Sequence, residues 1–208
     1  MALSPLIFGC SGPLLTRVEA KFFSRRQPFG FILFARNLES PSQITELCKS
    51  LRTSVGWNAP IFIDQEGGRV ARLGSPHWFE FQAALVDAHH PRSERLFWLR
   101  GRLIAHNLIS TGVDVNCAPL GDLAREITHP VLKSRCYGET VAQVVMNAKA
   151  MHQGLRSGGV SGVIKHLPGH GLAQMDSHIE LPIVKNDIKI LYKKDFSTFR
   201  DLNYIEMA

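Results

Sequence analysis

Residues 59–68 read APIFIDQEGG, an apolar run that ends in two acids and two glycines. A short continuous apolar run is typical of a strand that is buried on both faces, as strands are in a parallel sheet. The glycines predict that the chain turns away directly after the acids. The stretch therefore predicts a buried strand whose carboxyl end carries the polar side chains of residues 64–66.

The same combination recurs along the chain, in alternation with stretches of helical periodicity. We expect strands in PLIFGC (5–10), FGFILFAR (29–36, fully buried), APIFIDQEGG (59–68), GVDVNCAPLGD (112–122) and GVSGVIKH (159–166), and the start of a sixth in YIEMA (204–208). Apolar spacing predicts helices from residue 41, from about 93, after 140 and near 195–202. Repeated β-then-α segments predict a parallel sheet covered by helices.

Two α/β architectures fit this alternation, a doubly wound open sheet and a (β/α)8 barrel. Polar residues gather where the strands end, at 36–37, 64–66, 116–122 and 165–166. In a barrel these ends converge on one mouth, whereas in an open sheet only the switch-point crevice receives them. We therefore expect a single domain over residues 1–208, an incomplete TIM-type barrel of five to six β/α units, with no second domain.

Composition narrows the function classes. The 208 residues are 45% apolar and 20% charged with a net charge of +6, but the basic clusters are only pairs, so we expect no nucleic-acid partner. No apolar run is long enough for a membrane span, and the opening LSPLIFGC lacks the basic residue of a signal peptide. Four widely spaced cysteines without C-x-x-C predict a reducing cytoplasm. No pattern predicts an oligomeric state.

The stretch KHLPGHGLAQMDSH, residues 165–178, concentrates ionisable groups in an irregular loop. Its residues His166, His170, Asp176 and His178 have the chemistry of zinc ligands. However, the charge of Lys165 opposes a cation, and the spacing matches no compact metal motif. We expect no metal or other cofactor.

Asp176 and His178 suit a different chemistry, since residues at i and i+2 of an extended chain share one side. There a carboxylate orients an imidazole and stabilises its charged form, which makes histidine a general acid/base. The same spacing equally suits an aspartate that only caps the loop. Spacing alone leaves both interpretations open.

A third group follows the strand of residues 59–63. Asp64 can accept two sugar hydroxyls, and Arg72 can donate several hydrogen bonds in a fixed fork. For Glu66 and Arg69 we expect a mutual ion pair near the rim. Arg135 follows the fourth strand and could reach the same mouth.

Six segments together resemble the family 3 glycoside hydrolases, in the bacterial β-N-acetylhexosaminidase branch. They are GFILFARN (30–37), IDQEGGRVAR (63–72), DVNCAPLGDL (114–123), SRCYGE (134–139), KHLPGHG (165–171) and DSHIELP (176–182). The resemblance implies a barrel and retaining hydrolysis of non-reducing terminal β-N-acetylglucosamine from peptidoglycan turnover fragments in the cytoplasm. It implies a small saccharide or muropeptide as partner.

The resemblance also implies roles for individual residues. It makes His178 the general acid/base, oriented by Asp176 on a mobile loop. It assigns substrate binding to Asp64, Arg72, Arg135, Lys165 and His166.

In this family the aspartate nucleophile follows the seventh strand, and the sequence ends at Ala208 before one, so we expect a C-terminally truncated, inactive chain. Two other functions remain open: a non-catalytic or decayed sugar-binding protein, and a metal-dependent hydrolase using His166, His170 and His178.

Overall fold

Over the residues that the structure describes, the chain forms one parallel sheet of five strands that is flanked by helices. The computed structural model describes residues 3–175, 179 and 181–208. Its elements are β1 (Ser4–Phe8), α1 (Arg17–Arg26), β2 (Pro28–Leu33), the 3-10 turn η1 (Ala35–Asn37), α2 (Pro41–Val55), β3 (Ile61–Ile63), α3 (Ala84–Ala88), α4 (Ser93–Ser110), β4 (Val115–Asn116), α5 (Pro130–Lys133), α6 (Val141–Ser157), β5 (Ser161–Gly162), α7 (Ile188–Lys193) and α8 (Asp195–Asp201). The strand order is β1-β2-β3-β4-β5.

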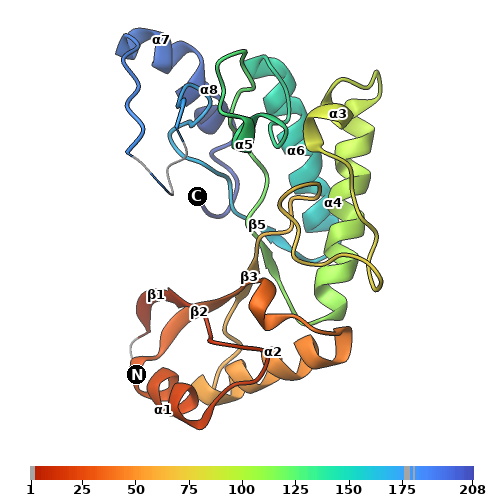
Figure 1. Ribbon diagram of the computed structural model, residues 1–208, viewed down its shortest axis with the longest axis vertical. Helices are drawn as coiled ribbons and strands as arrows, with labels where there is room; N and C mark the ends of the chain where they lie inside the picture. Colours follow the sequence, from red (N-terminus) through yellow and green to blue (C-terminus); the bar gives the residue numbers. More distant parts are fainter. Residues whose placement is uncertain (1–2, 176–178, 180) are drawn as a thin grey trace.

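This consecutive order distinguishes the two candidate architectures. A doubly wound sheet reverses its order at a switch point, whereas barrel strands follow one another around the axis. All four neighbouring pairs are parallel, without reversal. Figure 1 shows the result as an arc with α2, α4 and α6 along its outer side. The α/β, barrel-type prediction is confirmed, and over the described residues the sheet is not closed.

The edges of the arc show which strand predictions hold. Val163 forms a parallel bridge with Met207, which confirms that residues 204–208 begin to pair as a sixth strand. The prediction of a fully buried strand over residues 29–36 is wrong at both ends: Phe29 is 40% exposed, and Ala35 and Arg36 are exposed in the turn η1. The Phe29 ring lies near those of Trp57 and Phe62 at the start of β2. Within β2, Gly30, Phe31 and Leu33 are buried and Ile32 is half-buried.

Local sequence explains how α2 begins and ends. The hydroxyl of Ser40 caps the first turn by accepting the Gln43 N–H, and the following proline suits the first helical position. Gly56 ends the helix with φ +78°, a left-handed conformation that glycine adopts without strain. The apolar face predicted for this helix is buried: Ile44, Leu47, Leu51 and Val55.

Glycines set the distance between α4 and α6, the two long helices of the outer layer. A Cβ on Gly101 would overlap the carbonyl oxygen of Met151, and a Cβ on Gly154 would overlap that of Trp98. The backbones therefore touch where the helices cross. This contact turns the Gly101 face of α4 towards α6. Leu103 belongs to the apolar spacing that predicts this helix, but it lies on the solvent side and is 50% exposed.

Candidate active site

The carboxyl ends of β3, β4 and β5 bring polar side chains together on one side of the sheet. Asp64 directly follows β3, Asp122 follows β4, and Lys165 and His166 follow β5. Pairing continues beyond the last two strands through a parallel bridge between Leu120 and Lys165. Residues far apart in the sequence are thereby placed next to one another.

Lys165 lies at the centre of this group. Its Nζ is 2.7 Å from Asp64 Oδ1 and 2.7 Å from Glu66 Oε1. Burial lowers the pKa of Lys165, but the attraction of Glu66 and Asp64 outweighs burial and raises it above its ordinary value. Lys165 is therefore a permanent cation that donates hydrogen bonds.

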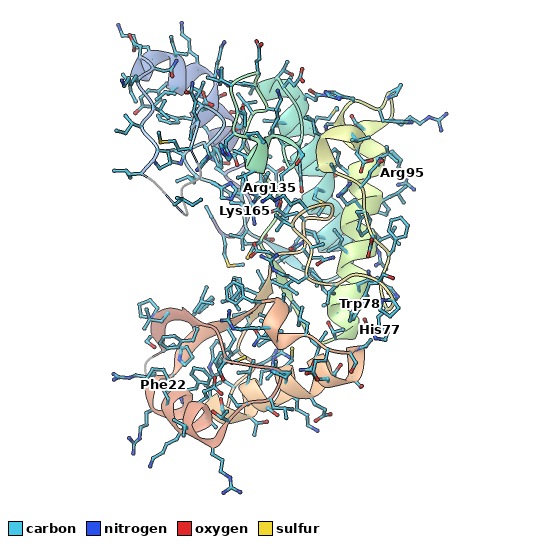
Figure 2. All side chains as sticks on the ribbon, in the orientation of Figure 1. Phe22, His77, Trp78, Arg95, Arg135 and Lys165 are labelled. Carbon is cyan, nitrogen blue, oxygen red and sulfur yellow. The ribbon has the colours of Figure 1, made fainter. Side chains whose placement is uncertain are left out.

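Arg135 reaches the same group from the loop after α5, and Figure 2 shows it beside Lys165. Its Nε and Nη2 lie 2.9 and 2.8 Å from the two carboxylate oxygens of Glu66. The predicted pair of Glu66 with Arg69 is therefore wrong. Glu66 is 1% exposed while Arg69 is exposed, and two mostly buried cations, Lys165 and Arg135, already occupy its oxygens. A buried carboxylate needs partners that are buried with it.

Asp64 is held in its ionised form. Burial raises the pKa of this carboxyl, but Lys165 and Arg72 together outweigh burial and place the pKa below its ordinary value. Arg72 Nη2 lies 3.4 Å from Asp64 Oδ2. Since an ionised carboxylate has about four acceptor sites, Asp64 retains acceptor capacity for ligand hydroxyls.

His166 completes the group. Its Nδ1 lies 2.7 Å from Asp122 Oδ2, and its Nε2 lies 3.3 Å from Arg135 Nη2. All the side chains expected to bind substrate thus lie in one connected set. We call it the charged cluster: Asp64, Glu66, Arg72, Asp122, Arg135, Lys165 and His166.

The expected acid/base pair, Asp176 and His178, lies outside the described residues, and its role stays a prediction. The metal interpretation depends partly on the same residues. Within residues 3–175, 179 and 181–208, no group of three or more His, Cys, Asp or Glu side chains is arranged to hold a metal ion. His166 turns its Nδ1 towards Asp122.

The sequence did not predict that two carboxylates, Glu66 and Asp122, belong to the site. Each is buried; Glu66 joins Arg135 to Lys165, and Asp122 holds the ring of His166. Their position after strands was the available signal. Cys117 also follows a strand here, and burial raises the pKa of its thiol to about 11, so it is protonated at neutral pH and is a poor nucleophile.

Comparison with known proteins identifies the family. The model of the glycosyl hydrolase family 3 N terminal domain matches residues 15–205. The chain belongs to glycosyl hydrolase family 3. Among its relatives are proteins named beta-hexosaminidase from Pseudomonas aeruginosa, 31% identical over 95% of this chain, and from Alkalilimnicola ehrlichii, 34% identical over 97%. The chain spans 58% and 59% of their lengths.

Solved structures agree with this membership. The family 3 fold of this chain matches native NagZ from Neisseria gonorrhoeae with a TM-score of 0.91 at 27% identity, covering 99% of this chain and 61% of that one. A β-N-acetylglucosaminidase of family 3 from Paenibacillus matches with a TM-score of 0.85 at 29% identity, covering 94% of this chain and 38% of that one. Across the described ranges, no helix combines the length and apolar character needed to cross a membrane.

Proposed function

We propose that this chain forms the sugar-binding part of a retaining β-N-acetylhexosaminidase, which removes non-reducing terminal β-N-acetylglucosamine from peptidoglycan turnover fragments. Its relatives are named beta-hexosaminidase, and the NagZ of N. gonorrhoeae has been solved with N-trifluoroacetyl-D-glucosamine. A single catalytic domain in the cytoplasm is part of the proposal. The four free cysteines, three of them buried, support that location.

The observation that carries the proposal is the position of Lys165 between two carboxylates, beside Arg135. A sugar presents hydroxyls that both donate and accept. The charged cluster provides a hydrogen-bond acceptor at Asp64 and donors at Lys165, Arg72 and Arg135. Fixed, partly buried charges of both signs suit a neutral polyhydroxy ligand, which makes directional hydrogen bonds but brings no charge of its own.

For the chemical step we assign proton transfer to His178, with Asp176 orienting its ring, on the strength of the family resemblance. A retaining glycosidase also needs a carboxylate nucleophile. In the described part of the chain, the cluster carboxylates are all engaged: Asp64 and Glu66 by cations, Asp122 by three N–H donors. We assign the nucleophile to none of these three carboxylates, and we therefore expect residues 1–208 to be inactive alone.

Hydrolysis of an aryl N-acetylglucosaminide by the purified 208-residue chain tests this expectation. We expect no turnover above the buffer rate. Turnover that is retained by the wild type and abolished by His178→Ala would overturn it, since the nucleophile would then lie within these residues.

The engaged carboxylates also favour a second candidate function, a non-catalytic sugar-binding protein. Calorimetry with N-acetylglucosamine examines the site that both functions share. Heat of binding without turnover in the 208-residue chain supports the sugar site and fits both functions. Absence of binding at millimolar sugar would contradict the sugar site in either one.

A further inference from the structure

Asp122 is a buried carboxylate that no lysine or arginine contacts at hydrogen-bond distance, among the residues that the structure describes. It is 1% exposed and accepts three hydrogen bonds from the segment that follows β5. Its Oδ1 lies 2.6 Å from the His170 backbone nitrogen. Its Oδ2 lies 3.2 Å from the His166 backbone nitrogen and 2.7 Å from His166 Nδ1. One carboxylate thus holds both the backbone and the ring of this turn.

These contacts determine where the proton of His166 resides. A carboxylate only accepts, so the 2.7 Å contact requires a proton on Nδ1. On the other side of the ring, Nε2 faces Nη2 of Arg135 at 3.3 Å. An arginine only donates, so Nε2 must present its lone pair. Both neighbours therefore select the same neutral tautomer, with the proton on Nδ1.

We propose that Asp122 is a positioning residue of the sugar site, which fixes His166 as the Nδ1–H tautomer so that Nε2 accepts a hydrogen bond from a sugar hydroxyl. This inference rests on the proposed function for its ligand. The pairing of Asp122 with His166 does not depend on the ligand and can be tested without one.

The tautomer gives the site a direction of hydrogen bonding. A hydroxyl that enters between the two side chains donates to Nε2 in place of Arg135, and its oxygen then accepts from Arg135. With the proton on Nε2 instead, histidine and arginine would both donate, and the hydroxyl proton would lose its acceptor. The side chain of His166 is 35% exposed, so a ligand can reach this edge of the ring.

The first experiment measures the tautomer directly in the whole 208-residue chain. Histidine-selective 15N labelling with two-bond 1H–15N correlation distinguishes a protonated Nδ1 from a protonated Nε2, and the His166→Asn spectrum assigns the signals. We expect His166 to carry its proton on Nδ1 at neutral pH. A protonated Nε2 in the wild type, in either the other tautomer or the imidazolium, would overturn the proposal even if no variant folds.

The second experiment is Asp122→Asn, which keeps the shape of the side chain. Backbone N–H groups face both oxygens of Asp122, that of His170 at Oδ1 and that of His166 at Oδ2, so the amide NH2 must oppose one of them in either orientation and weaken the hold on His166. We expect affinity for N-acetylglucosamine to fall about 10-fold, as when a hydrogen-bond partner is lost from a buried group. An unchanged affinity in the folded variant would refute the positioning role.

Asp114→Asn is the matched control at the opposite end of β4. Asp114 also accepts a backbone N–H, that of Ile61 at 2.7 Å, but it pairs with Arg52 away from the charged cluster. We expect it to leave the tautomer and sugar affinity unchanged. A wild type with Nδ1–H that binds no sugar would refute the sugar-site function and leave the pairing intact, whereas sugar binding by the Nε2–H form would refute the pairing alone.

Discussion

Replacing Glu66 by glutamine would remove the negative charge that joins Arg135 to Lys165. The Glu66 side chain is 2% exposed, and its oxygens lie 2.7 Å from Lys165 and 2.8 and 2.9 Å from Arg135. Glutamine has nearly the same shape, but its NH2 group would point at one of the two cations. The mostly buried charges of Lys165 and Arg135 would then be only partly compensated.

Breaking a buried ion pair in this way costs about 3–5 kcal/mol, a large share of a typical stability of about 5–15 kcal/mol. At about 2–4 °C per kcal/mol for a chain of this size, the thermal midpoint should fall by about 6–20 °C. Circular dichroism during heating, with urea unfolding as a second measure, gives both quantities.

Glu139→Gln is the control, since this carboxylate is 57% exposed and its contact with His89 is 3.5 Å long. Its loss should cost less than about 1 kcal/mol. If Glu66→Gln cost no more than the control, the reasoning that the cluster charges depend on one another would be wrong.

Two further predictions concern packing and pH. Gly154→Ala should lower the free energy of unfolding by about 1–3 kcal/mol or more, because the new methyl group overlaps the Trp98 carbonyl oxygen. Gly12 has open space around it, so Gly12→Ala should change that free energy by less than about 0.5 kcal/mol in the same urea titration. The folded pKa of Asp64 lies below its unfolded value of about 3.9, so its contribution to stability is present above that pH and is lost as the pH falls through the folded pKa. The free energy of unfolding should therefore fall less steeply between pH 5 and pH 3 in Asp64→Asn than in the wild type; equal slopes would contradict the shift.

The charged cluster explains why these predictions differ in size. Asp64 and Glu66 share the cation of Lys165, and Arg135 joins Glu66 to the ring of His166. A change at a buried member leaves other buried members uncompensated, whereas a change at an exposed pair is screened by water. Replacing Glu66 should therefore lower both stability and sugar affinity. A change in the tautomer of His166 should alter sugar affinity alone.

Some features of this protein could be predicted from sequence because they are local. The apolar run before Asp64 and the helical spacing of residues 41–55 depend on neighbours in the chain, and both predictions are confirmed. The rule that parallel strands end on one side also placed Lys165 beside Asp64, although 101 residues separate them. By contrast, the partner of Glu66 was expected three residues away and lies 69 residues away in the sequence.

The sequence by itself determined the strand and helix periodicity, the barrel-type order of β/α units and the strand ends at which functional side chains gather. These follow from backbone geometry and the burial of apolar faces, which act over a few residues at a time. Only the tertiary structure decided which charged groups contact one another. Examples are the pairing of Glu66 with Arg135 and Lys165, and the contact through which Asp122 orients His166. The physical reason is that an ionised group takes its partner according to burial, and burial exists only once distant segments have packed together.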